Sequence, residues 1–81
     1  MVNPVKELRD RTGWDRRRFA VATGLDYNDI YRAEHGYPSK LPRRMARQLA
    51  NHAGIIESEV QQQYQNWRQQ QREALLEQVG A

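Results

Sequence analysis

FAVATGLDYNDIYRAEHG, at residues 19–36, has a spacing of small and apolar residues that predicts the architecture. An apolar run rich in alanine is interrupted by Gly24, and a polar segment follows. Two helices joined by a tight turn need a small side chain where their backbones approach, which Ala20 provides. The turn needs a residue that adopts positive φ without steric cost, which Gly24 provides. Ile30 supplies a branched apolar side chain facing back into the crossing. The spacing therefore predicts a helix-turn-helix whose second helix presents its polar face outward.

Local signals divide most of the chain into helices, and strand signals are nearly absent. Asn3 offers a side-chain N-cap, and Pro4 suits the first helical position, where its missing N–H costs nothing. Asp15 and Asp26 offer similar caps to two further helices. Single glycines follow the helical segments, as is typical of helix C-termini. The predicted helices cover residues 4–12, 16–23, 27–35, 42–53 and about 57–79.

The last predicted helix is rich in glutamine, which occupies seven of the eleven positions 61–71. Val60, Tyr64 and Trp67 fall on one helical face at spacings of four and three, and Leu75 continues that face loosely. The alternative is a flexible glutamine-rich tail, against which the apolar face argues. We expect the inner half of this helix to pack on the domain and the outer half to be available to a partner.

Length and composition exclude several classes of protein. The 81 residues suffice for one small domain. The chain has no cysteine, and its histidines and carboxylates form no cluster at ligand spacing, so we expect no metal and no cofactor. No serine has a partner at catalytic spacing, so we expect no enzymatic activity. No apolar run approaches the length of a membrane span, so we expect a cytoplasmic protein without membrane or small-molecule partners.

The charge is unevenly distributed along the chain. Residues 1–53 hold 11 of the 13 Lys/Arg and 6 of the 10 acidic residues, a net charge of +5. Residues 54–81 hold the other two basic and four acidic residues, a net charge of −2. Arginine predominates, and its planar fork matches phosphate and base edges. The distribution favours a polyanionic partner for the first two thirds of the chain; the alternative is a solvated arginine-rich surface.

Further residues on both sides of this stretch continue the pattern of residues 19–36. It comprises Gly13-Trp14-Asp15, Phe19-Ala20, Gly24, Ile30, Glu34-His35-Gly36, Leu49-Ala50 and Gly54-Ile55. On this pattern, residues 5–56 resemble the helix-turn-helix domain of phage Cro and repressor proteins and their bacterial relatives. The resemblance implies that residues 1–56 form a helix-turn-helix DNA-binding domain. Residues 57–81 lie outside the shared pattern, and we expect them to form an additional long helix for packing and dimerisation, so that the whole chain is an all-α fold of five helices.

The resemblance also implies roles for individual residues. Arg9 and Glu34 match a buried ion pair that ties the first helix to the third. Asparagine bonds adenine bidentately and arginine bonds guanine, each worth about 1–3 kcal/mol of discrimination. The residues placed where relatives contact bases, or on the same exposed side, are Tyr27, Asn28, Tyr31 and Arg32. The residues placed at phosphate-contacting positions are Arg16, Lys40 and Arg43, and Arg17 is the next candidate on the second helix.

Several positions depart from the family pattern. Ala33 stands where a larger apolar residue is usual, and Asp26 adds a negative charge near the reading helix, where it also serves as the N-cap. Arg16 stands where relatives often have a glutamine that touches phosphate and braces the reading helix. Asp29 places a negative charge on the reading helix itself. It accepts a hydrogen bond from a cytosine amino group, pairs with a nearby arginine, or points away from DNA, and the sequence leaves these three open.

Three functions fit these features. The first is a sequence-specific regulator, a repressor of phage, prophage or small-operon type, that binds double-stranded DNA as a homodimer. Its partner contacts are expected on the last helix, at Tyr64, Trp67 and Leu75. The second is a protein-interaction module of the same fold that does not read DNA. The third is a recombination accessory or architectural DNA-binding protein. Fold alone does not separate them, because function depends on the site.

Overall fold

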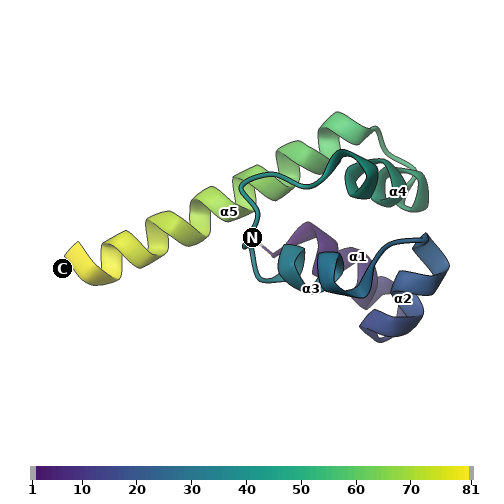
Figure 1. Cartoon of the computed structure of the whole chain (residues 1–81). Coiled ribbons are helices and arrows are strands. Elements are labelled where there is room, and N and C mark those ends of the chain that lie inside the picture. The colour runs from purple at the N-terminus through teal and green to yellow at the C-terminus, as the bar shows by residue number, and fades with distance from the viewer. Residues whose placement is uncertain (1, 81) are drawn as a thin grey trace.

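The computed structural model describes residues 2–80, and this part of the chain folds into helices without any strand. Four short helices form a compact body, and a long fifth helix crosses it and projects beyond it (Figure 1). This confirms the predicted all-α class with five helices and a long C-terminal helix. The helices are α1 (Pro4–Thr12), α2 (Arg16–Thr23), α3 (Tyr27–Glu34), α4 (Arg43–Ala53) and α5 (Glu57–Gly80).

The helix ends follow the predicted capping signals. The side chain of Asn3 accepts hydrogen bonds from the backbone amides of Val5 (2.8 Å) and Lys6 (3.2 Å) at the start of α1. Asp15 and Asp26 cap α2 and α3 in the same way. Helix α3 ends at Glu34, one residue before the predicted end. The caps satisfy amide groups that a helix otherwise leaves without partners.

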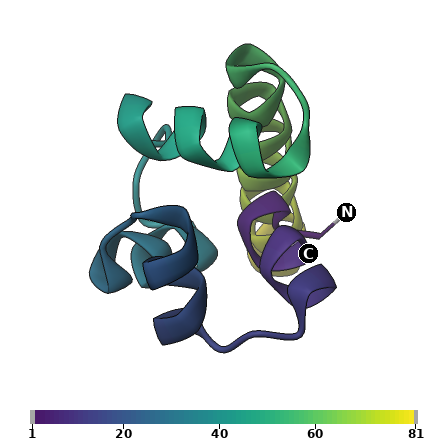
Figure 2. The same cartoon turned by 90° about the vertical axis from the view of Figure 1, so that its right-hand side faces the viewer.

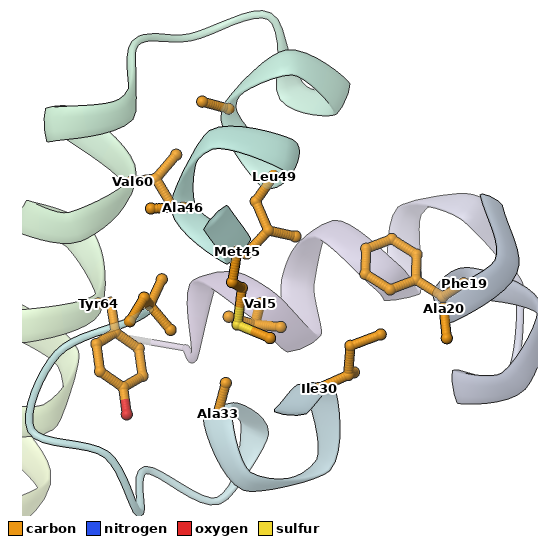
Figure 3. Packing of buried hydrophobic residues seen from close by; sticks show 12 residues of the cluster. Val5, Phe19, Ala20, Ile30, Ala33, Met45, Ala46, Leu49, Val60 and Tyr64 are labelled. Carbon is orange, nitrogen blue, oxygen red and sulfur yellow. The ribbon is translucent and has the colours of Figure 1, made fainter. Parts of the chain in front are cut away.

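The core is built from residues of all five helices (Figure 3). Phe19 and Ile30 are fully buried between α2 and α3, and Ala33 permits a close approach of α3 to its neighbours. Helix α5 packs mainly against α4 and α1 (Figure 2). The buried apolar residues are Val5, Phe19, Ala20, Ile30, Ala33, Leu41, Met45, Ala46, Leu49, Ala50, Val60 and Tyr64.

The inner half of α5 belongs to this core. Tyr64 has no exposed surface, and its hydroxyl donates a hydrogen bond to the carbonyl oxygen of Pro38 (2.6 Å). The side-chain amide of Gln61 bonds both backbone groups of Leu41, accepting from its N–H (3.0 Å) and donating to its carbonyl (2.6 Å). These bonds hold the α3–α4 loop against α5. The burial of Tyr64 corrects the expectation that it contacts a partner, because its own chain encloses the ring.

Gly36 and Trp67 lie close together where α5 passes the end of α3. Gly36 has a φ of 73°. A Cβ atom built there would lie 2.9 Å from both Cζ3 and Cη2 of the Trp67 ring. Gly54 has a nearly identical φ of 72° and nothing within 4 Å of a built Cβ. The two glycines share the same backbone requirement and differ in the space around them.

We expect Gly36→Ala to destabilise the fold more than Gly54→Ala. Both substitutions place a Cβ at positive φ, which costs roughly 1–2 kcal/mol. At residue 36 the clash with the indole ring adds about 1–3 kcal/mol. Urea unfolding followed by circular dichroism measures both values. Equal losses for the two variants would show that Trp67 moves aside freely and that the junction is loose.

The outer half of α5 extends past the other helices (Figure 1). Its Leu75 and Leu76 are 61% and 62% exposed. Among the described residues, no helix combines the length and apolar character needed to cross a membrane. The outer half therefore carries two exposed leucines among mostly polar residues.

Candidate nucleic-acid interface

Helices α2 and α3 form a tightly connected pair. Gly24 ends α2 with a φ of 72°, and its amide bonds back to the last turn of α2. Asp26 then opens α3 by accepting a hydrogen bond from the amide of Asn28 (2.7 Å). With Ile30 and Ala20 buried between the helices, the opposite side of α3 faces outward. The pair therefore presents one whole face of a short helix to solvent.

The outer face of α3 carries the four residues predicted to contact bases. Tyr27, Asn28, Tyr31 and Arg32 are all exposed. Their positions, i, i+1, i+4 and i+5, place them on one side of a helix. Among the described residues, the side chains of Asn28 and Arg32 form no hydrogen bond or ion pair, so their polar groups face water. Asp29 is exposed beside them and also forms no ion pair within the described chain.

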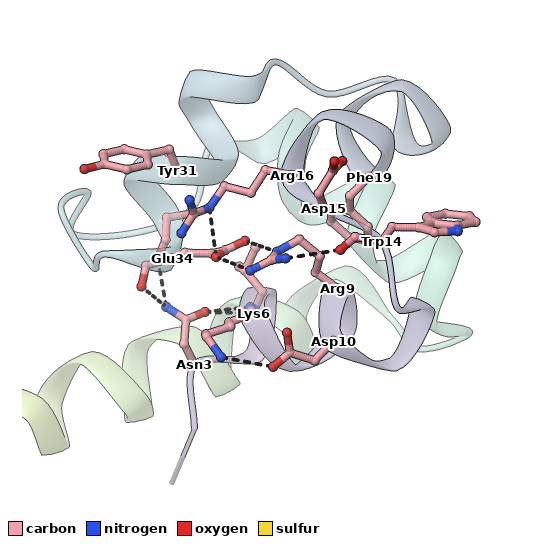
Figure 4. A network of polar contacts seen from close by, with 12 residues as sticks. Asn3, Lys6, Arg9, Asp10, Trp14, Asp15, Arg16, Phe19, Tyr31 and Glu34 are labelled. Atoms are coloured by element: carbon pink, nitrogen blue, oxygen red, sulfur yellow. Dashed lines mark hydrogen bonds and ion pairs between the residues drawn. The ribbon is translucent and has the colours of Figure 1, made fainter.

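A buried carboxylate fixes the back of α3 to α1 and α2 (Figure 4). Glu34 has a side chain only 2% exposed, and Arg9 reaches it with two hydrogen bonds, Nε to Oε2 at 2.8 Å and Nη2 to Oε1 at 3.1 Å. The third Arg9 bond, from Nη1, ends on the carbonyl of Trp14 (3.1 Å). The hydrogen bonds to Glu34 raise the pKa of Arg9. The ion pair implied by the family resemblance is confirmed.

Arg16 joins the same carboxylate from α2. Its Nε lies 3.2 Å from Oε1 of Glu34, and its guanidinium carbon lies 5.2 Å from the centre of the Tyr31 ring. A cation at this distance from an aromatic face is attracted by the ring. Arg16 is thus held between the buried Glu34 and the exposed Tyr31, and it braces the outer face of α3. Its contact with phosphate remains a prediction.

Arg17 borders a shallow hollow at the start of α2. The hollow has a volume of about 260 Å³ and is lined by Arg9, Asp15, Arg16, Arg17 and Tyr27. Arg17 is exposed there and forms no ion pair within the described residues. The hollow places a free guanidinium next to Tyr27, one of the predicted base-contacting residues.

The predicted phosphate contacts beyond α3 lie in different surroundings. Lys40 is exposed in the α3–α4 loop. Arg43 is exposed but lies 3.7 Å from the carboxylate of Glu57, which Arg47 also approaches, at 3.3 Å. Exposed ion pairs of this kind are weak, at about 0–1 kcal/mol. Arg43 therefore remains available to another anion at little cost.

The three predicted partner residues of α5 separate into different environments. Tyr64 is in the core, Trp67 is half-buried against Gly36, and only Leu75 is exposed. Sequence periodicity placed them on one face, but the body of the protein covers that face only as far as Trp67. Leu76 does not belong to the predicted apolar face, yet it is as exposed as Leu75.

An exposed aromatic cluster at the end of α3 was not predicted. The His35 ring lies 4.1 Å from Tyr31 and 5.5 Å from Tyr37, between ring centroids. Tyr37 belongs to the loop after α3, where helical periodicity gives no information about neighbours. The only signal in the sequence is that an aromatic residue, Tyr37, follows closely after Tyr31 and His35. The cluster extends the outer face of α3 towards α5.

The described residues contain no group of three histidine, cysteine or acidic side chains that could hold a metal ion. In comparisons with known proteins, the chain matches no family model, no curated protein and no solved structure.

Proposed function

We propose that this protein is a sequence-specific regulator of transcription that binds double-stranded DNA. In this proposal α3 enters the major groove and reads base edges with Tyr27, Asn28, Tyr31 and Arg32. The observation that carries it is the division of α3 into two faces, one sealed in the core and one exposed with unpaired asparagine and arginine side chains. Amide and guanidinium groups recognise adenine and guanine in that groove. The resemblance of residues 5–56 to Cro and repressor proteins supports the same assignment.

Basic residues beside α3 would supply the sequence-independent part of binding. Arg17, at the start of α2, and Lys40, after α3, are exposed on either side of the reading helix along the chain. Phosphate contacts fix register and orientation, whereas base contacts provide specificity. The proposed mechanism is repression, in which the bound protein blocks access to a promoter.

A homodimer is part of this proposal. The outer half of α5 projects from the body with Leu75 and Leu76 exposed, and contact between copies would cover this apolar surface. A dimer would bind two inverted half-sites spaced by about one helical turn of DNA, or a multiple. Leu76→Ser combined with Leu75→Ser would then yield a monomer that remains helical, as measured by sedimentation and circular dichroism.

The test of DNA reading is selection of bound duplexes from a random library, followed by two substitutions. We expect an enriched motif for the natural protein, and a loss of about 1–3 kcal/mol of base discrimination for Asn28→Ala and for Arg32→Ala. Lys6→Ala is the control, since Lys6 is an exposed basic residue on α1 that pairs with Asp10. Retention of the full motif by both α3 variants would contradict the proposal.

A protein-interaction module is the second candidate. It is favoured by the exposed tyrosines Tyr27, Tyr31 and Tyr37, because aromatic residues are enriched in protein interfaces. The exposed Asp29 on the same helix would repel a phosphate backbone. The absence of any enriched motif, with binding that disappears as salt rises, would favour this candidate over DNA reading.

A further inference from the structure

A groove separates the C-terminal end of α3 from the middle of α5. Its volume is about 400 Å³. One side is formed by His35 and Gly36, and the other by successive turns of α5. The lining residues are Glu34, His35, Gly36, Trp67, Arg68, Gln71, Arg72 and Leu75. The groove thus combines an aromatic ring and a leucine with two arginines.

The two arginines give the groove a positive charge. The Nε of Arg68 donates a hydrogen bond to the carbonyl of Gly36 (3.0 Å), which orients the guanidinium beside the end of α3. Arg72 lies one turn further along α5, is exposed, and forms no ion pair within the described residues. Glu34 also lines the groove, but its carboxylate is buried and paired with Arg9 and Arg16. The free charges facing the groove are therefore basic.

The two acidic residues in the outer half of α5 lie away from this side. At 100° per residue, the mean direction of Arg68 and Arg72 differs by about 140° from that of Glu73 and Glu77. Residues 54–81 have a net charge of −2, which by itself argues against a polyanionic partner for this part of the chain. At the groove the local charge is the opposite, because only the basic side of α5 borders it.

The groove continues the outer face of α3. His35 lines it, and the His35 ring lies 4.1 Å from the ring of Tyr31, which belongs to that face. A duplex lying against Tyr31 and Arg32 and passing the C-terminal end of α3 would next meet Arg68 and Arg72. The guanidinium fork matches the geometry of a phosphate group.

We propose that this groove binds the phosphate backbone of the DNA duplex beyond the end of α3, with Arg68 and Arg72 as its ligands. The proposal rests on the DNA-binding function argued above and adds α5 to the DNA-contacting elements. The Gly36 carbonyl holds Arg68 in place, and Arg72 extends the contact by one turn. Leu75 lines the groove and Leu76 does not, so with DNA in the groove the contact between copies proposed above would be made through Leu76.

The test is the salt dependence of binding to a fluorescently labelled, mixed-sequence duplex of about three helical turns. Loss of one phosphate contact reduces the slope of log K against log salt by about 0.9, and lowers affinity about eightfold at 0.1 M salt. We expect both changes for Arg72→Ala. Arg72→Lys keeps the positive charge and should retain the slope of the natural protein. Arg11→Ala is the matched control, because it removes an exposed arginine from α1 and leaves the groove intact.

The arms of this experiment separate the two proposals. An unchanged slope for Arg72→Ala, together with a reduced slope for Arg17→Ala, would overturn the groove assignment while leaving DNA binding in place. Absence of salt-dependent binding by the natural protein would overturn the DNA-binding function itself. A change in sedimentation for Arg72→Ala without a change in slope would assign the groove to a second copy of the chain, and would also overturn the inference.

Discussion

Glu34→Ala is expected to lower the free energy of unfolding by about 3–5 kcal/mol. The substitution leaves Arg9, whose side chain is 15% exposed, without its carboxylate partner. It also frees Arg16 from the contact that holds it beside Tyr31. An uncompensated charge in a partly buried site costs far more than the intact pair contributes. Since a chain of 81 residues has a total stability of about 4–12 kcal/mol, the loss removes a large share of that stability, and at the lower end of the range the variant would be largely unfolded at room temperature.

Glu7→Ala provides the matched control for this prediction. Glu7 also pairs with an arginine, Arg11, at 2.9 Å, but that pair is exposed on α1. Its loss should cost about 0.2–0.5 kcal/mol. Urea unfolding monitored by circular dichroism compares the two variants. If the Glu34 and Glu7 variants lost the same small amount of unfolding free energy, the ion pairs around Glu34 would be a surface feature and would not organise the interface.

Tyr64→Ala is expected to cost about 3–5 kcal/mol, the range for removing a large aromatic side chain from a core. The ring of Tyr64 is fully buried, and its hydroxyl is bonded to Pro38 in the α3–α4 loop. Tyr64→Phe keeps the ring and should cost about 1–2 kcal/mol, because the Pro38 carbonyl loses its donor. A small loss for Tyr64→Ala would instead mean that α5 is dispensable for the stability of the body.

Tyr64 also makes stability depend on pH in the alkaline range. Burial raises the pKa of its hydroxyl, because the charged phenolate is poorly solvated inside the protein. A group whose pKa is higher in the folded state stabilises the fold fully below its unfolded pKa, which is about 10 for tyrosine. This contribution is lost as pH rises through the folded pKa. The free energy of unfolding should therefore fall above pH ~10, and Tyr64→Phe should lack this part of the decrease.

The organisation around Glu34 connects stability to the proposed function. The same carboxylate receives Arg9 from α1 and Arg16 from α2, and Arg16 in turn lies over Tyr31 on the outer face of α3. Asn3 strengthens the arrangement by donating from its side-chain amide to the carbonyls of Ala33 (2.9 Å) and Glu34 (3.1 Å). A rigid support of this kind presents the outer side chains in one orientation, which recognition of base edges requires.

The sequence by itself determined the helices and the exposed face of α3. Asn3, Asp15 and Asp26 act on amides within three residues of themselves, so capping can be deduced without knowing the neighbours. The turn at Gly24 depends on its own φ. The outward position of Asn28 and Arg32 follows from the helical repeat, once Ile30 is assigned to the core.

Only the tertiary structure decided which faces of those helices pack together and which stay exposed. Periodicity placed Tyr64 and Leu75 on one face of α5, but one is enclosed and the other exposed, because the body covers only the first part of that helix. The bonds of Gln61 to Leu41 and of Asn3 to the end of α3 join residues 20 to 31 positions apart. Arg68 and Arg72 meet His35 across a groove although the charge of their segment suggested otherwise. Capping and periodicity act within one or two turns of chain, whereas burial, ion pairing and groove formation depend on the packing of helices that are distant in sequence.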